Sequence, residues 1–241
     1  MAGWLGYSVR RKLLDEDLEA VKTRIRGSVL EVGCGTIGRR GRFRPPFEQT
    51  KDWTYVDLRG SAEPTIQADI EHLPIRDTHF DTVICLEVLE YVPHPGAALS
   101  ELRRVLKPGG TLIVSTPFLH RADALQDRWR FTEHGLHLVL NQIGFRVDDT
   151  NRQGAALAVV VNILKFAVSS VPKTLWRKAL GALAYLPLTA LLGMDGLSSK
   201  LLPVLGTFST GYLLVAVKVE RQTTPDFQEP FVPAIRHSVK V

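Results

Sequence analysis

The stretch VLEVGCGTIG, residues 29–38, decides the fold because an apolar run changes abruptly into glycines. The apolar half is typical of a buried strand, and Gly33, Gly35 and Gly38 follow it directly. Glycine adopts backbone angles that other residues avoid, and it lets a ligand approach the main chain closely. The stretch therefore predicts a strand followed by a tight, ligand-binding turn.

The spacing of these glycines predicts a nucleoside site. They fit the pattern G-x-G-x-x-G, and Asp57 lies 19 residues beyond Gly38, at the end of the next apolar run. In such a unit the main-chain N–H groups face the ligand, and the acid accepts both ribose hydroxyls. The pattern alone suits a nicotinamide or flavin dinucleotide as well as an adenosyl cofactor.

Further acidic residues separate these two ligand classes. Glu31 lies two residues before the first glycine, where a carboxylate would repel a pyrophosphate. Asp69 and Ile70 follow 12 and 13 residues after Asp57, where an acid can accept the adenine amino group and an apolar side chain can pack on the base. Glu87 ends another apolar run. A site with only acidic side chains favours a cationic adenosyl ligand over phosphates.

Periodicity and turn residues predict an α/β protein with a doubly wound, mostly parallel sheet. Strands are expected at residues 28–33, 53–58, 80–87, 111–117, 145–150 and 211–218, and helices at 15–26, 95–106 and 132–143, with a tight turn at 107–110. The expected organisation is an N-terminal helical segment (1–27), a ligand-binding core (28–154), an apolar helical insertion (155–208), the last core strand (209–220) and an extended tail (221–241).

The insertion holds two long apolar segments, residues 155–171 and 175–193. They are interpreted either as helices packed over the end of the sheet or as helices lying in a membrane interface, with residues 155–208 as the peripheral membrane contact. Lys165 and Pro187 argue against a segment that crosses the bilayer.

Composition limits the partners and the cellular location that are expected for the protein. Its 241 residues are 45% hydrophobic and 23% charged, with a net charge of +5, which is compatible with either a solvated basic surface or an anionic partner. Cys34 and Cys85 have no metal-binding spacing, so no metal site is expected and a reducing compartment is favoured. The first residues show no secretion signal, which favours a cytoplasmic location. Aromatic and basic residues do not interleave, so a nucleic-acid partner is not expected.

The motifs VLEVGCG, YVDL, ADIEHLPI, FDTVICLEVLEYVPHPGAALSELRRVLKPGGTLIVSTP and GYLLVAVK together resemble the class I S-adenosylmethionine-dependent methyltransferases over residues 28–150, with the last motif as the family's final strand. The resemblance implies a seven-stranded sheet and S-adenosyl-L-methionine as cofactor. It also departs from the family pattern, because Ile37 stands where the family usually has a glycine, a role that Gly38 could take over. By position, the family's cofactor residues are Glu31, Gly33 and Gly35 at the methionine end, Asp57 at the ribose, Asp69 and Ile70 at the adenine, and Leu86 and Glu87 beside the sulfonium.

Residues 118–136 resemble a subgroup of the family whose genes often accompany saccharide and cell-envelope assembly genes. That resemblance makes His120 the expected general base, with Asp127 orienting it and Arg130 reaching the acceptor. The alternatives are His94 as the base and an Asp127–Arg130 pair that only holds the loop. The expected acceptor is a small molecule, saccharide or lipid-linked, methylated at oxygen. The apolar insertion and the basic loop at residues 39–44 suit an amphiphilic anionic acceptor.

Two other functions remain open from the sequence. A non-catalytic protein could retain this fold and bind ligand without turnover. A dinucleotide-dependent oxidoreductase would bind a nicotinamide cofactor and ignore S-adenosylhomocysteine.

Overall fold

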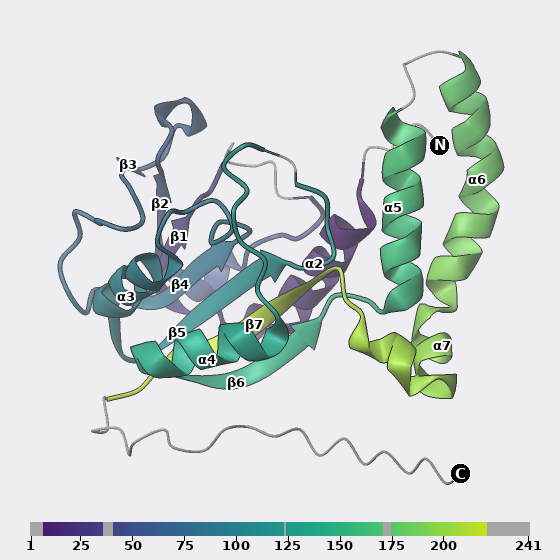
Figure 1. The fold of residues 1–241 in the computed structure, drawn as a ribbon. Helices are drawn as coiled ribbons and strands as arrows, with labels where there is room; N and C mark the ends of the chain where they lie inside the picture. Colours follow the sequence, from purple (N-terminus) through teal and green to yellow (C-terminus); the bar gives the residue numbers. More distant parts are fainter. Residues whose placement is uncertain (1–6, 36–40, 123, 171–174, 221–241) are drawn as a thin grey trace, which may run out of the picture.

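The computed structural model describes residues 7–35, 41–122, 124–170 and 175–220. These residues form an α/β structure around one seven-stranded sheet, with a helical hairpin standing at one end (Figure 1). The strand order is β3-β2-β1-β4-β5-β7-β6. The strands are β1 (Gly27–Val32), β2 (Thr50–Asp57), β3 (Ile66–Gln67), β4 (Phe80–Leu86), β5 (Leu106–Pro117), β6 (Phe145–Arg152) and β7 (Gly211–Lys218).

Strand direction confirms the mostly parallel, doubly wound sheet expected from the sequence. Strands β3, β2, β1, β4 and β5 run parallel to one another, whereas β7 is antiparallel to both β5 and β6. The first strand, β1, lies inside the sheet between β2 and β4, and the chain reverses its direction of winding there. In open α/β sheets, ligands bind outside the carboxyl ends of the strands at such a switch point. The glycine turn after β1 and the acid at the end of β2 therefore meet at this edge.

Helices bury both faces of the sheet. On one face, α3 (Pro95–Val105) and α4 (Glu133–Ile143) pack their apolar stripes against β1, β4, β5 and β7. On the other, α2 (Val9–Ala20) covers β1, β4, β5 and β7 through Leu14 and Leu18. Thr132 caps α4 by accepting a hydrogen bond from the Gly135 N–H, and Gly144 ends it in the left-handed conformation at φ +98°. Both residues act as the sequence predicts.

The first described helix, α2, begins earlier than expected. The sequence predicts a helix at residues 15–26, but α2 covers Val9–Ala20 and is followed by a 3₁₀ turn at Lys22–Arg24. Ser8 caps α2 by accepting from the Arg11 N–H at 3.1 Å. This correction places basic residues, not only the apolar stripe, in the first turns of α2.

The turn at residues 107–110 lies within β5, which begins at Leu106 instead of residue 111. Gly109 has φ +71°, as expected of the glycine in such a turn. The pairing register with β4 shifts between Phe80 and Thr82, so the sheet absorbs the turn as an irregularity.

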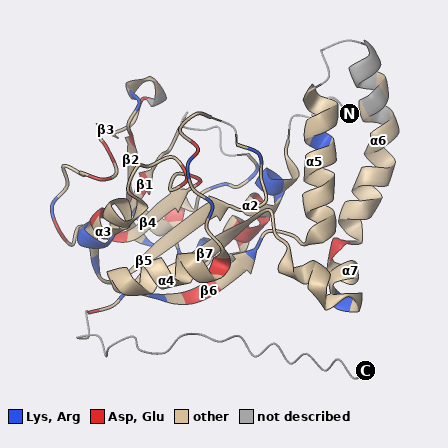
Figure 2. Cartoon of the chain, viewed as in Figure 1, with Lys and Arg blue, Asp and Glu red and all other residues tan. Residues whose placement is uncertain are grey.

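The apolar insertion is helical, as predicted. It contains α5 (Ala156–Ser170), α6 (Leu175–Gly193) and α7 (Asp195–Leu201), and α5 contacts α2. Its described parts carry few charges, as the scarcity of blue and red in Figure 2 shows. Several large apolar side chains are exposed there, including Leu183 at 78% and Leu186 at 73%. Within the described residues, none of the helices combines the length and apolarity that a membrane span requires.

Candidate functional site

The glycine turn after β1 has the predicted backbone. Gly33 and Gly35 both adopt positive φ, at +65° and +57°. A Cβ added at Gly33 would lie 2.2 Å from Val88 Cγ2, so packing as well as the turn excludes a side chain. A Cβ at Gly35 would meet no atom of the described residues within 4 Å, so space for a ligand adjoins the main chain there. Ile37 and Gly38 lie outside the described residues.

Asp57 ends β2 directly beside this turn. Its carboxylate is 6% exposed, and Oδ2 accepts a hydrogen bond from the Gly35 N–H at 2.9 Å while Oδ1 accepts from the Arg59 N–H at the same distance. Glu31 is equally buried near the end of β1 and accepts from Trp53 Nε1 at 3.1 Å. The fold thus brings both acids to the carboxyl ends of the strands that flank the turn. Each carboxylate oxygen has two acceptor positions, so Asp57 can hold the turn and still accept from a ligand hydroxyl.

The expected adenine-binding pair lies after the short strand β3. Asp69 is exposed and its Oδ1 accepts from the Glu71 N–H at 2.9 Å, forming a local turn. Ile70 is 8% exposed and belongs to the core on the α3 side of the sheet. Asp69 therefore has its carboxylate at the surface, whereas Ile70 is mainly a residue of the hydrophobic core.

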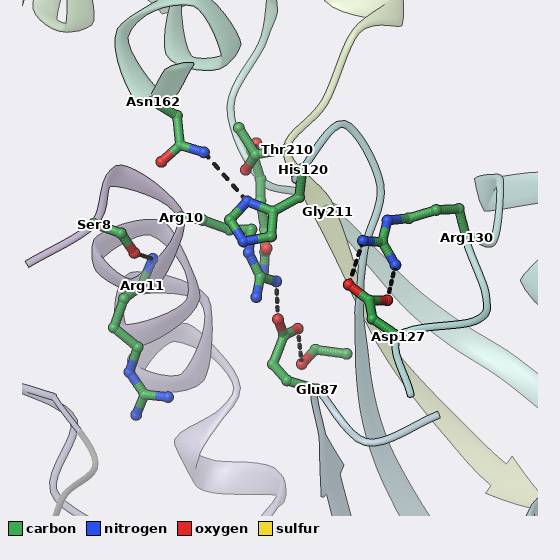
Figure 3. A network of polar contacts seen from close by, with 12 residues as sticks. Ser8, Arg10, Arg11, Glu87, His120, Asp127, Arg130, Asn162, Thr210 and Gly211 are labelled. Carbon is green, nitrogen blue, oxygen red and sulfur yellow. Dashed lines mark hydrogen bonds and ion pairs between the residues drawn. The ribbon is translucent and has the colours of Figure 1, made fainter. Parts of the chain in front are cut away.

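The end of β4 differs from the expected all-acidic crevice, because a cation from α2 occupies it. Arg10 forms a close ion pair with Glu87 Oε2, and Ser115 donates to Glu87 Oε1 at 2.8 Å (Figure 3). Glu87 has φ +58°, unusual for a residue with a side chain, and follows Leu86, the last residue of β4. The pair neutralises the carboxylate that was expected to border the sulfonium. The sequence reasoning missed Arg10 because α2 was expected to start only at residue 15.

The three residues expected to catalyse, His120, Asp127 and Arg130, all lie in the loop after β5. Asn162 of α5 contacts the His120 ring, with 3.4 Å between Asn162 Nδ2 and His120 Nδ1, and Phe166 packs edge-on against the same ring. The Asp127 carboxylate is held by both terminal nitrogens of Arg130, one at 2.7 Å from Oδ2 (Figure 3). His120 thus has an anchor on α5, and the expectation that Asp127 orients it stays a prediction. Arg130 is engaged by Asp127, as in the alternative structural reading.

The same loop is fixed to the segment after β4. The N–H groups of Arg128 and Trp129 donate to the Glu90 carbonyl, and Trp129 Nε1 donates to the Val92 carbonyl at 2.8 Å. His94, the other base considered, lies at the surface on Glu71, with 3.0 Å between His94 Nδ1 and Glu71 Oε2. His120 is therefore the histidine that the fold holds between the strand ends and α5.

Glu90 is a buried acid that the sequence reasoning did not single out. Its side chain is 1% exposed and its Oε2 has no hydrogen-bond partner among the described residues. Burial, helped by the negative charge of Asp127, raises the pKa of Glu90 to about 7, although Arg10 and Arg130 partly offset the rise. The signal available in the sequence was the spacing of Glu87 and Glu90 after the fourth strand.

This burial predicts that Glu90 makes folding pH-dependent. The pKa of Glu90 is higher in the folded state, so its protonation stabilises the folded protein. This contribution to the free energy of unfolding is complete below the ordinary pKa near 4.5 and disappears as pH rises through about 7. We compare the free energy of unfolding of Glu90→Gln with that of the wild type at each pH. This difference should shift in favour of the variant by about 2 kcal/mol between pH 5 and pH 8. Urea unfolding at both pH values measures this. Asp17, whose pKa burial also raises to about 7, titrates in both proteins and cancels in the difference.

Comparison with known proteins agrees with this geometry. Residues 30–114 match the family model described as a methyltransferase domain, and this range runs from within β1 into β5 and includes the glycine turn, Glu31 and Asp57. This chain contains a class I S-adenosylmethionine-dependent methyltransferase domain. A ubiquinone biosynthesis O-methyltransferase of Xanthomonas euvesicatoria pv. vesicatoria is 34% identical over 114 residues, 41% of this chain and 48% of that protein. An uncharacterized protein of Methanocaldococcus jannaschii is 40% identical over 95 residues, 36% of this chain and 39% of that protein. The chain thus spans about half or less of these relatives.

Solved structures share the fold of this methyltransferase domain at low sequence identity. The [4+2]-cyclase SpnF superposes with a TM-score of 0.58 and 21% identity, covering 86% of this chain and 82% of SpnF. A 1,6-didemethyltoxoflavin-N1-methyltransferase of Burkholderia thailandensis has a TM-score of 0.50 and 18% identity, covering 90% and 81%. These likenesses concern the fold alone.

Proposed function

We propose that the protein transfers a methyl group from S-adenosylmethionine to an oxygen of a small-molecule acceptor. The observation that carries this proposal is the open glycine turn beside the buried carboxylate of Asp57, at the switch point of the sheet. An oxidoreductase is disfavoured because Glu31, a buried carboxylate two residues before the glycine turn, would repel a pyrophosphate. The O-methyltransferase relatives support transfer to oxygen.

The chain's own residues account for the steps other than donor activation. When bound, the cofactor supplies a methyl group activated on a sulfonium. Gly33, Gly35 and Asp57 would hold the adenosyl donor, and His120 would accept the hydroxyl proton of the acceptor as that oxygen takes up the methyl group. For His120 to use Nε2 as the base, its Nδ1 must carry the proton and donate to the Asn162 amide oxygen. A half-turn of the Asn162 amide provides this contact.

For the acceptor class we propose an amphiphilic molecule, saccharide or lipid-linked, that reaches the protein at the cytoplasmic face of a membrane. The exposed apolar side chains of α5, α6 and α7 support contact with a membrane interface. SpnF, a cyclase with a similar fold, illustrates why the fold alone leaves a non-methylating function as the rival. That rival predicts ligand binding without turnover against any acceptor.

Asp57→Asn tests the donor site. The amide keeps the side-chain volume and can still accept from the Gly35 N–H, but it loses the charge that strengthens hydrogen bonds to the ribose. We expect the Kd for S-adenosylhomocysteine to rise about 30-fold, the loss of about 2 kcal/mol typical of a hydrogen bond to a charged group. Isothermal titration calorimetry measures it.

Glu48→Gln is the matched control, since Glu48 is an exposed acid near the start of β2. Its affinity should stay within about twofold of the wild type. Equal affinity of Asp57→Asn and wild type, or no binding by the wild type, would overturn the proposed donor site.

A further inference from the structure

The carboxylate at the end of β4 lies beside the glycine turn. Glu87 directly follows Leu86, the last residue of β4, and the next residue, Val88, lies against Gly33 of the turn. Because β1 and β4 are neighbouring parallel strands, both chains leave the sheet at the same edge. Glu87 therefore lies at the edge of the space where the proposed donor would bind.

Two side chains hold the Glu87 carboxylate. Ser115, which is fully buried in β5, donates a hydrogen bond to Glu87 Oε1 at 2.8 Å. Arg10 reaches Glu87 Oε2 from the first turn of α2 and forms an ion pair with it (Figure 3). The side chains of Arg10 and Glu87 are only 14% and 16% exposed, so water screens their charges partly. Removal of one charge of this pair would therefore act strongly on any other charge nearby.

The packing of α2 holds Arg10 in this place. Leu14, one turn further along α2, is buried in a cluster with Ile84 of β4 and Ile113 of β5. Residues one turn apart lie on the same side of a helix, so Arg10 belongs to the side of α2 that faces the sheet. A packed helix, not a loop, thus brings the guanidinium to Glu87.

A second acid lies within reach of the charge of Arg10. That charge partly offsets the rise in the pKa of Glu90, whose side chain is buried and whose Oε2 has no hydrogen-bond partner among the described residues. Asp127 and Arg130 act on the same carboxyl group. Arg10 therefore has another acid nearby when Glu87 engages a different cation.

The two ligands expected at this site differ in charge at one atom. The sulfur of S-adenosylmethionine is a sulfonium and carries a positive charge, whereas the sulfur of S-adenosylhomocysteine is neutral. A carboxylate on its own favours the charged ligand, and a guanidinium that pairs with this carboxylate cancels the preference.

We propose that Arg10 and the positively charged sulfur of the donor compete for the Glu87 carboxylate, which makes Arg10 the residue that sets how strongly the site prefers the donor to its demethylated product. This role rests on the proposed donor site. While Arg10 holds Glu87, the pair has no net charge and the site distinguishes the two ligands weakly. After methyl transfer the sulfur is neutral, so Glu87 returns to Arg10 and the product is released more easily. Arg10 thus determines ligand preference and takes no part in the chemical step.

The ratio of two dissociation constants tests the proposal. Calorimetry on the full chain, at one pH and with no acceptor present, gives the Kd of S-adenosylmethionine and that of S-adenosylhomocysteine. Arg10→Gln removes the cation from Glu87, so the ratio should shift about tenfold in favour of the charged donor. Glu87→Gln removes the carboxylate and keeps the cation, so the ratio should shift in the opposite direction. The double variant has no net charge at the pair, as in the wild type, and should restore the ratio.

Lys12→Gln is the matched control. Lys12 lies on the same helix and pairs with Glu16 at the surface, so this variant removes the same charge from a solvent-exposed position. Its ratio should stay within about twofold of the wild type. Arg10→Lys keeps the charge, and its ratio should lie closer to the wild type than that of Arg10→Gln. Partial unfolding of a variant weakens both ligands in the same proportion, so it leaves the ratio unchanged.

The possible outcomes separate this proposal from the proposed function. An unchanged ratio in Arg10→Gln, or an equal shift in Lys12→Gln, would show that Arg10 does not compete for Glu87. The donor site would still stand in that case, because both ligands bind. If the wild type bound neither ligand, the proposed donor site would itself be wrong, and the competition with it.

Discussion

His120→Ala is expected to lower kcat by about 100-fold or more, while the affinity for S-adenosylhomocysteine stays within about twofold. The imidazole is the proton acceptor of the proposed reaction, and it belongs to the loop after β5, not to the glycine turn that would hold the donor. Loss of the base therefore slows the chemical step without touching donor binding. The measurement is methyl transfer from a labelled donor to the acceptor that a panel of saccharide and lipid-linked compounds identifies, alongside calorimetry with S-adenosylhomocysteine.

The control for this prediction is His134→Ala, which removes an exposed histidine from the first turn of α4. Its kcat should equal that of the wild type. A second variant, Asn162→Ala, removes the contact that holds the His120 ring and should lower kcat less than His120→Ala does, because the base itself remains. If His120→Ala kept full kcat, the acceptor would have to arrive already deprotonated or neutral, and His120 would be only a packing residue beside Phe166.

The elements that the sequence predicts well are those set by local chemistry. The glycine turn and Asp57 are predictable because a left-handed turn needs glycine and because parallel strands end at one edge. The α4 boundaries are predictable because Thr132 and Gly144 are strong capping residues. The two-residue strand β3 has no such signal, since so short a segment shows no periodicity.

The parts that were missed depend on contacts between distant segments. Arg10 reaches Glu87 only because α2 packs across the sheet, and no spacing in the sequence indicates that ion pair. The Asn162–His120 contact likewise needs the α5 hairpin to fold back over the loop after β5. Glu90 was passed over because its unusual environment comes from burial, which a run of alternating apolar and acidic residues does not specify.

The two glycines of the turn are expected to fail in different ways when each is changed to alanine. Gly33→Ala should lower the free energy of unfolding by about 3 kcal/mol, because a left-handed alanine costs about 1 kcal/mol and the new Cβ would overlap Val88 Cγ2 at 2.2 Å. Gly35→Ala should cost only about 1 kcal/mol, since within the described part of the chain its Cβ meets nothing within 4 Å. That empty space is where the donor binds, so Gly35→Ala should weaken S-adenosylhomocysteine by tenfold or more. Urea unfolding and calorimetry separate the two effects.

The double variant Gly33→Ala with Val88→Ala checks the cause assigned to the first change. Removing the valine methyl groups relieves the overlap, so the double variant should lose less stability than the sum of the two single losses. The backbone cost remains, since alanine still has to adopt φ near +65°. Additive losses would show that the overlap with Val88 is not what excludes a side chain at Gly33. Unchanged donor affinity in Gly35→Ala would show that the space beside this main-chain turn is not the donor site, because a methyl group there cannot avoid a ligand that lies against the backbone.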